Sequence, residues 1–271
     1  MSGSEIDGVR KWLNTQGFPL EMRTADQFIK AGFNTVQSHY YEVDGEVHEI
    51  DLRAQCAWTD DNCVFISVVF VVECKSSINT ARPWVIFTSS RGSNGPFTLC
   101  ARDATTYGRR LLSNLAFRWE EMRKLPILLL PERIGFGLSV SHGDGTDKND
   151  VAFHAVKSVR RAAKAIWTCN DFHHELLDAK IVFPVIVTGQ PLYECYLKDS
   201  EIVLEKVDTG VLSRQAGGRT ELIHIVSESA LPKFVSDAYQ SATTLLDQYK
   251  ELTAVASAYY KDRVNPGPKE Y

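Results

Sequence analysis

Residues 64–77 read VFISVVFVVECKSS, and the interpretation of the whole chain starts from this stretch. Residues 64–72 are almost all apolar and mostly β-branched, which is typical of a strand buried on both faces of a sheet. Because residues two apart in a strand share a face, we expect Glu73 and Lys75 to point the same way and Cys74 to point to the opposite face. The stretch therefore predicts a carboxylate and an ammonium group side by side at the end of a buried strand.

The composition predicts an ordinary soluble globular protein, because 44% of the 271 residues are hydrophobic and 24% are charged. No apolar run approaches the roughly 20 residues that cross a membrane, and the first residues carry no secretory signal pattern. The six cysteines form no CxxC motif. We therefore expect a cytoplasmic protein with free thiols, no membrane partner and no structural zinc.

The charge distribution argues against a protein that coats nucleic acid by bulk electrostatics, because the formal net charge is −4. Residues 78–150 nevertheless contain ten Lys and Arg against seven Asp and Glu, a local charge of +3 that leaves −7 for the rest. A polyanionic partner would therefore meet a local basic patch.

The hydrophobic pattern predicts an α/β protein, with one domain over residues 1–271 and an insertion at about 77–150. Within the insertion, 83–90 is strand-like, 104–124 favours a helix, and the Gly- and Asp-rich segment 135–150 is typical of a loop. Outside it we expect helices at 4–16, 19–31, 151–168 and about 231–260, and strands at 33–43, 47–58, 180–188, 192–197, 202–207 and 221–226.

Two further carboxylates occupy positions that a solvated surface does not explain. Glu21 precedes Ala25 and Phe28 by four and seven residues, which places it on the apolar side of helix 19–31. Asp51 lies in the second strand of a predicted hairpin, where it alternates with Ile50 and Leu52, which we expect to share the other face.

These carboxylates suit a hard divalent cation such as Mg²⁺, which takes oxygen ligands from one or two carboxylates, water and substrate phosphate. Asp51 and Glu73 on adjacent strands can be direct ligands, the backbone carbonyl of Cys74 a third, and Glu21 a ligand through water. Lys75, beside Glu73, can help to deprotonate water or neutralise charge that develops on phosphorus.

Asp51, followed after twenty-one residues by Glu73-Cys74-Lys75, resembles the PD-(D/E)XK nuclease superfamily, which has the restriction-endonuclease-like fold. The resemblance includes the helix with the inward Glu21 and the apolar strand that ends in ExK. Ile50 stands where the family's name has proline. The family's αβββαβ core resembles helix 19–31, three strands, helix 151–168 and strand 180–188, about 150 residues in all.

The resemblance implies a Mg²⁺-dependent endonuclease, with Mn²⁺ as a substitute, that acts on DNA rather than RNA. It implies that Asp51 and Glu73 bind the metal, that Lys75 assists hydrolysis and that Glu21 completes the site. A homodimer, a protein partner in a multi-component system, and a general likeness to restriction or phage-defence nucleases also follow from it.

Other interpretations remain open at this level. Glu73 and Lys75 alone would make an ordinary ion pair, and the chain could be a catalytically inactive subunit that binds nucleic acid, or an interaction module with a buried polar network. Candidate nucleic-acid contacts are Gln37 and a basic stripe on the exposed side of helix 151–168, formed by Lys157, Arg160, Arg161 and Lys164. Arg109, Arg110 and Arg118 are weaker candidates for the same role.

Overall fold

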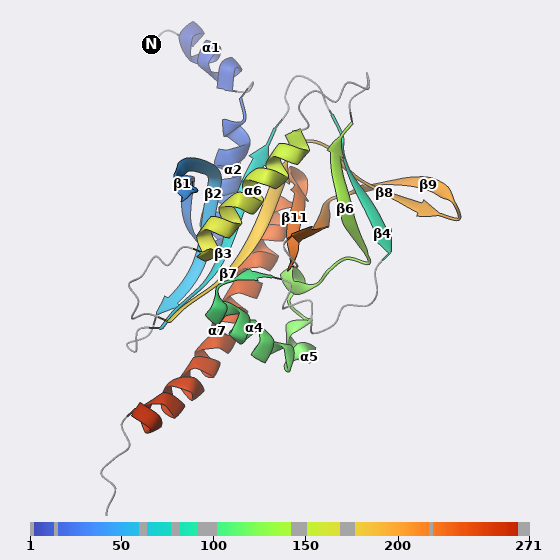
Figure 1. Ribbon diagram of the computed structural model, residues 1–271. Helices are drawn as coiled ribbons and strands as arrows, with labels where there is room; N and C mark the ends of the chain where they lie inside the picture. Colours follow the sequence, from blue (N-terminus) through green and yellow to red (C-terminus); the bar gives the residue numbers. More distant parts are fainter. Residues whose placement is uncertain are drawn as a thin grey trace, which may run out of the picture.

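The structure is a computed structural model, shown in Figure 1. It describes residues 3–13, 16–59, 64–76, 82–90, 102–141, 151–168, 177–216 and 219–264. Its helices are α1 (Gly3–Leu13), α2 (Phe18–Ala31), α4 (Thr106–Ala116), α5 (Trp119–Met122), α6 (Val151–Thr168) and α7 (Leu231–Val264), with 3-10 turns η1 (Pro126–Leu128) and η2 (Glu228–Ala230). None of the helices in these ranges is both long enough and apolar enough to cross a membrane.

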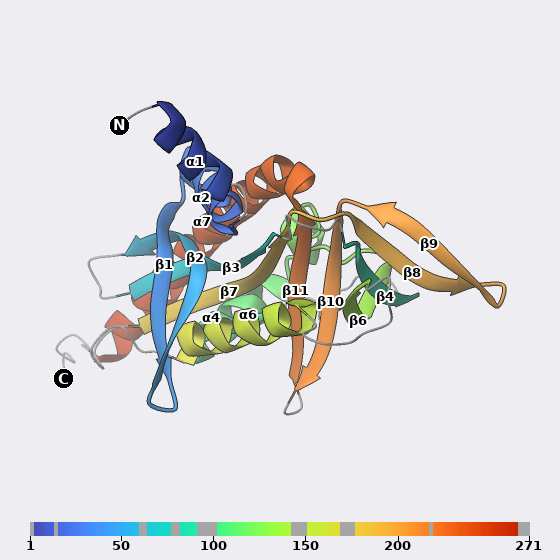
Figure 2. The same ribbon diagram turned by 90° about the horizontal axis from the view of Figure 1, so that it is seen from above.

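The strands are β1 (Asn34–Val43), β2 (Glu46–Thr59), β3 (Val64–Lys75), β4 (Trp84–Ser90), β5 (Asp103–Ala104), β6 (Arg133–Val140), β7 (Leu177–Thr188), β8 (Leu192–Lys198), β9 (Glu201–Val207), β10 (Thr209–Ala216) and β11 (Arg219–Ser227). They form one mixed sheet in the order β1-β2-β3-β7-β11-β10-β6-β4-β8-β9, with β5 beside β7. The first three strands are antiparallel, whereas β3, β7 and β11 run parallel. Figure 2 shows β8 and β9 reaching away from the helices as a two-stranded ribbon.

Helices cover both faces of the sheet around β3, which confirms the predicted α/β class. The helix α6 packs on one face, and α2, α4 and α7 pack on the other (Figure 1). Along β3, Val69 and Val71 belong to the cluster beneath α6, while Phe70 and Val72 belong to the opposite cluster. The strand is therefore buried on both faces, as its apolar run predicts.

The predicted hairpin is confirmed, because Asp44 and Gly45 take positive φ angles of 54° and 80° between β1 and β2. The expected face of Ile50 is wrong, however. Ile50 packs beneath α6, whereas Leu52 packs in the opposite cluster. The change of face falls at Asp51, where the opposite residue, Ser38, has a φ of 47° and the pairing of β1 with β2 is interrupted.

Outside the insertion β10 was not predicted, but the other helices and strands lie close to their predicted positions. The insertion differs from its prediction in two places. The expected helix at 104–124 divides into α4 and α5. The segment predicted as a loop forms β6 over its first part, and 142–150 lies outside the described residues. Because β4 and β6 lie in the same sheet as the core strands, the insertion adds strands to the core.

Packing explains why glycines that are typical of a loop lie in strands. A Cβ atom on Gly135 of β6 would stand 2.6 Å from Ile86 Cγ2, and one on Gly210 of β10 would stand 2.4 Å from Ile86 Cδ1. The Ile86 side chain of β4 therefore occupies the space above both glycines. A glycine in a strand here marks close approach of a neighbouring side chain.

Candidate active site

Asp51 lies where β2 separates from β3. The regular pairing of these strands ends at Leu52 and Val72, so the next backbone N–H of β3 that faces β2 has no strand partner. Cys74 N–H instead donates a hydrogen bond to Asp51 Oδ2 at 2.7 Å. The Asp51 carboxylate thus replaces a strand carbonyl and is fixed beside the end of β3 as the sequence predicts. Its second oxygen accepts no hydrogen bond from the described residues.

Glu73 is buried at the end of β3, with 5% of its surface exposed, and its two oxygens have different partners. Lys75 Nζ lies 2.5 Å from Glu73 Oε1, so the two side chains share a face as predicted. On the other side, the hydroxyl of Ser158 in α6 donates to Glu73 Oε2 at 2.8 Å. Residues of β3 and α6 therefore fix the position of this carboxylate jointly. Asp51, Glu73 and Lys75 are called the carboxylate site below.

Burial and neighbouring charges shift the pKa values of the groups in the carboxylate site. The pKa of Asp51 is raised from 3.8 to about 7, mainly by burial and in part by the charge of Glu73, while the Cys74 hydrogen bond and Lys75 act in the opposite direction. Burial acts to lower the pKa of Lys75, but the charge and hydrogen bond of Glu73 outweigh it and the net shift is upward. The site therefore holds two carboxylates and one lysine at the end of a buried strand.

Glu21 approaches the carboxylate site from α2 and is half-buried. Burial raises its pKa, Lys75 opposes this shift, and Glu49 and Glu73 add to it. These influences place Glu21 within electrostatic reach of the site, which agrees with its predicted inward direction. Within the described ranges, no group of three His, Cys, Asp or Glu side chains is arranged to hold a metal ion, so Asp51 and Glu73 stand as a pair and Glu21 is not a third direct ligand.

A pocket of about 320 Å³ opens beside Glu73 and Lys75 on the α6 side of the sheet. Arg161 of α6 reaches across it to His48 of β2, with 3.1 Å between Arg161 Nη1 and His48 Nδ1. The His48 ring in turn lies against Tyr41 of β1. The residues that line the pocket are Tyr41, His48, Glu49, Glu73, Lys75, His154, Lys157, Ser158 and Arg161.

The predicted basic stripe on α6 proves heterogeneous. Lys157 and Lys164 are exposed, as expected, but Arg160 and Arg161 are half-buried, so the expectation of a uniformly exposed stripe is wrong. Arg160 forms an ion pair with Glu221 of β11, on a different side of the helix from the pocket. The difference arises because a helix turns about 100° per residue, so neighbouring arginines face different elements.

Gln37 is exposed on β1 and does not line the pocket. It lies opposite Leu52, whose side chain faces the cluster beneath α2 and α7, and paired residues of antiparallel strands share a face. The structure therefore does not bring Gln37 to the carboxylate site.

The pocket residues Ser158, His154, His48 and Tyr41 escaped the sequence analysis. A signal for part of this set exists, because His154, Lys157, Ser158 and Arg161 follow the three- and four-residue spacing of one helix face. The hydroxyl of Ser158 has no sequence signal of its own, since its partner Glu73 is 85 residues away.

Comparison with known proteins found no matching protein-family model, no matching curated protein and no matching solved structure. The interpretation of the site therefore depends on its own geometry and charge.

Proposed function

We propose that the protein is a Mg²⁺-dependent nuclease that hydrolyses phosphodiester bonds of nucleic acid, DNA rather than RNA. The observation that carries this proposal is the convergence of Asp51, Glu73 and Lys75 at the point where β2 separates from the end of β3. The element order α2, β1, β2, β3, α6, β7 supports a restriction-endonuclease-like core, since the resemblance to the PD-(D/E)XK superfamily implies that order.

The residues at the site fit a divalent cation. Among the described residues, one carboxylate oxygen of Asp51 has no hydrogen-bond donor, and the pKa of Asp51 is raised, mainly by burial and in part by the charge of Glu73. Asp51, Glu73 and the backbone carbonyl of Cys74 would hold Mg²⁺, with Glu21 acting through water, and Mn²⁺ would substitute. The bound ion would supply Lewis-acid activation of water and neutralise charge on the phosphate.

The chain's own groups then position the substrate. Lys75, held by Glu73, offers an ammonium group to the phosphate oxygens as negative charge develops on them. Lys157 and Arg161 line the same pocket and offer cationic donors to the nucleic-acid backbone. Ser158, which lines the same pocket, fixes the orientation of the Glu73 carboxylate by its hydrogen bond.

An inactive nucleic-acid-binding subunit on the same fold is the alternative. The strained pair of carboxylates disfavours it, because a chain that only binds nucleic acid gains nothing from unbalanced buried charge. Activity on both strands of a duplex would call for two sites, and hence for a homodimer or a partner protein.

The test is a cleavage assay on supercoiled plasmid, linear duplex and single-stranded substrates, with Mg²⁺, Mn²⁺ or EDTA. We expect cutting that depends on the metal and is lost in Lys75→Ala. Lys30→Ala is the matched control, because Lys30 is an exposed lysine that pairs with Asp26 far from the site. Its cleavage should equal that of the wild type.

Calorimetry with Mn²⁺ separates the remaining outcomes. Mn²⁺ binding that Asp51→Asn abolishes supports the metal site even if the substrate panel lacks the correct target. The absence of both Mn²⁺ binding and cleavage would contradict the nuclease proposal and favour the inactive subunit.

A further inference from the structure

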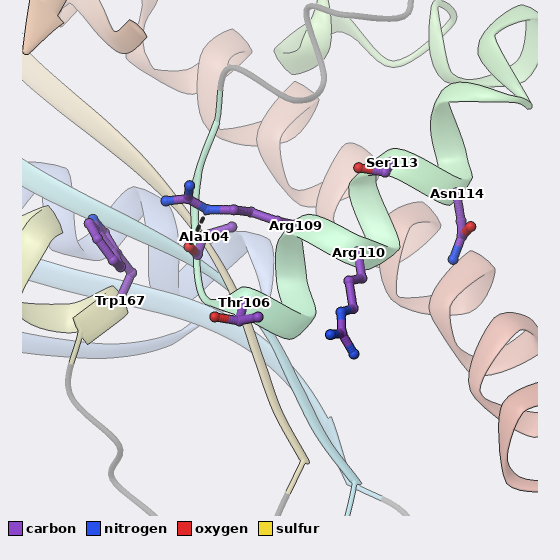
Figure 3. A pocket seen from close by; sticks show the side chains of 7 residues that line it. All are labelled: Ala104, Thr106, Arg109, Arg110, Ser113, Asn114 and Trp167. Carbon is purple, nitrogen blue, oxygen red and sulfur yellow. Dashed lines mark hydrogen bonds between the residues drawn. The ribbon is translucent and has the colours of Figure 1, made fainter. Parts of the chain in front are cut away.

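A second polar pocket, of about 560 Å³, lies between the first turns of α4 and the end of α6. Figure 3 shows Arg109, Arg110, Ser113 and Asn114 extending from α4, with the Trp167 ring of α6 on the far side. We call it the α4–α6 pocket. The described residues that line it include two guanidinium groups, hydroxyl and amide donors, and no carboxylate. This chemistry suits an anion that carries several oxygens.

The backbone around the α4–α6 pocket is held firmly. A Cβ atom on Gly108 would stand 2.4 Å from the carbonyl oxygen of Lys180, so glycine permits α4 to lie directly against β7. The hydroxyl of Thr105 caps the helix by accepting from Gly108 N–H, and it also donates to the carbonyl of Asp178. The start of α4 therefore faces the pocket in a fixed position.

The two arginines play different parts in the α4–α6 pocket. Arg109 donates from Nε to the carbonyl of Ala104 at 3.1 Å, and its guanidinium lies 5.4 Å from the centre of the Trp167 ring. It is thus part of the wall. Arg110 is exposed; its guanidinium lies 5.6 Å from the centre of the Tyr107 ring and forms no hydrogen bond or ion pair with a described residue. Its charge is available to a ligand.

A ridge of cations joins this pocket to the carboxylate site. Along α6, Lys157, Arg161 and Lys164 recur at spacings of four and three residues, from the neighbour of Ser158 to the turn before Trp167. Lys157 and Lys164 form no ion pair with any described residue. The nine residues from Ser158 to Trp167 span about 13 Å of helix axis, at about 1.5 Å per residue.

We propose that the α4–α6 pocket binds a backbone phosphate of the same nucleic-acid strand that enters the carboxylate site. A strand that follows α6 covers this distance in about four nucleotides, at about 3.4 Å per nucleotide of duplex. This proposal rests on the proposed function for its substrate class. In this proposal Arg110 binds a phosphate about four nucleotides from the cleavage site, so a strand must reach that far to gain the contact.

The experiment measures the affinity of the wild-type chain in EDTA for labelled duplexes of 4, 6, 8, 12 and 16 base pairs, chosen to span the expected length of about four nucleotides on each side. We expect a step in affinity once the strand reaches the pocket. Arg110→Ala should remove the step, weaken binding of the long duplexes about five- to tenfold and reduce the salt dependence by about one phosphate contact. Binding of the shortest duplex should not change.

The matched control is Arg10→Ala on α1, which removes an equally exposed arginine far from α4 (Figure 1). Equal behaviour of Arg110→Ala and Arg10→Ala would overturn the inference, and retained metal-dependent cleavage would then leave the proposed function intact. Saturable binding of a mononucleotide that Arg110→Ala abolishes, without any length dependence, would also overturn it. A length step lost in Arg110→Ala, in a chain that never cuts, would support the inference and contradict the nuclease.

Discussion

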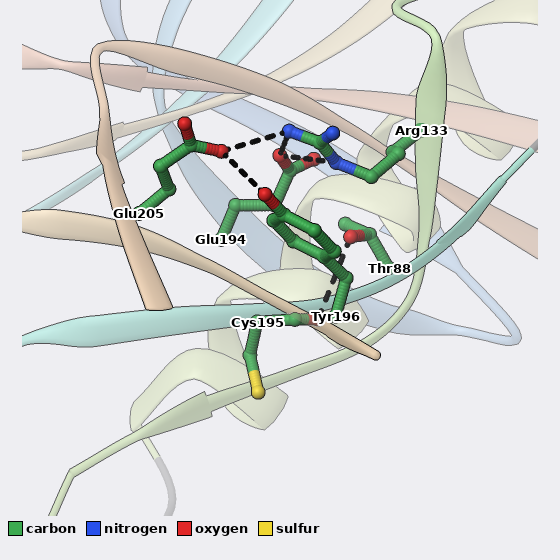
Figure 4. Close-up of polar contacts among 6 residues, drawn as sticks. All are labelled: Thr88, Arg133, Glu194, Cys195, Tyr196 and Glu205. Carbon is green, nitrogen blue, oxygen red and sulfur yellow. Dashed lines mark hydrogen bonds and ion pairs between the residues drawn. The ribbon is translucent and has the colours of Figure 1, made fainter. Parts of the chain in front are cut away.

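Two clusters in the molecule contain the same kinds of groups but differ in how their charges are balanced. The carboxylate site combines Asp51 and Glu73 with Lys75. At the other end of the sheet, Glu194 and Glu205 surround Arg133, and we call this the arginine cluster (Figure 4). Each cluster has two carboxylates and one cation, so composition alone does not separate them.

The arginine cluster satisfies its own groups. Arg133 donates from Nε and Nη2 to Glu194 Oε2, at 2.9 and 2.6 Å, and from Nη2 to Glu205 Oε2 at 3.0 Å. Its guanidinium lies 3.9 Å from the centre of the Tyr196 ring, and the Tyr196 hydroxyl donates to Glu205. One planar cation thus serves both carboxylates, and Glu205 remains half exposed to water. The arrangement is what a structural clamp between β6, β8 and β9 requires.

In the carboxylate site, one lysine faces two carboxylates, and it contacts only one of them. Lys75 is a point charge that contacts Glu73, and among the described residues Asp51 accepts a hydrogen bond only from the backbone N–H of Cys74. The pKa of Asp51 is raised mainly by burial, and the negative charge of Glu73 adds to the shift. The comparison teaches that a cluster which the chain does not neutralise by itself is the better candidate for a ligand.

The largest expected effect separates the two clusters directly. If the proposed function is correct, Glu73→Gln should lower the cleavage rate at least about a hundredfold, because the amide removes a proposed metal ligand and the partner of Lys75. Glu194→Gln should leave the cleavage rate within about twofold of the wild type and lower the free energy of unfolding by about 1 to 2 kcal/mol. Rates from the plasmid assay and urea denaturation measure the two quantities.

The assignment of catalysis to the carboxylate site and of stability to the arginine cluster would be wrong if the two variants showed each other's effects. A Glu194→Gln chain that folds as well as the wild type but does not cut would assign the chemistry to the arginine cluster. Loss of structure in Glu73→Gln, detected by circular dichroism, would make the carboxylate site a structural ion pair.

A second prediction concerns pH, and its size follows from burial. A carboxyl group with a pKa of about 7 in the folded chain and 3.8 in the unfolded chain binds its proton preferentially in the folded state between these values. The stability that Asp51 contributes is therefore full below about pH 4 and is lost as the pH rises through about 7. After allowance for solvent screening, the loss should be roughly 1 to 3 kcal/mol.

The measurement is the free energy of unfolding from pH 4 to pH 8 in EDTA, so that no metal masks the effect. Asp51→Asn should flatten the curve and be the more stable chain at pH 8. Asp247→Asn is the control, because Asp247 is an exposed carboxylate of α7. An identical slope for the wild type and Asp51→Asn would show that Asp51 does not titrate in this range.

Much of the fold around the carboxylate site was predictable from the sequence because its signals are local. The apolar run of β3, the Asp44-Gly45 turn and the apolar periodicity of α2 and α6 each specify one element. Alternation along β3 then placed Glu73 and Lys75 on one face. The position of Asp51 followed because a hairpin brings adjacent strands into register.

The remainder depends on contacts between distant segments. Gly135 is typical of a loop until Ile86, which packs against it, is taken into account. Ser158 is an ordinary helical serine until α6 is placed over the end of β3. The α4–α6 pocket likewise exists only because Gly108 lets α4 approach β7, which no local pattern indicates.

The smallest expected effect concerns α6, where a cation that is paired within the chain can be compared with one that is not. Arg160 is neutralised by Glu221, whereas Lys164 has no ion-pair partner among the described residues. Lys164→Gln should therefore weaken nucleic-acid binding a few-fold and lower the salt slope by about one contact, while Arg160→Gln should leave the slope unchanged. Titrations at several salt concentrations distinguish the two variants. A slope that falls equally in both would mean that Arg160 leaves Glu221 to bind phosphate, and that a satisfied ion pair on α6 does not exclude a role in binding.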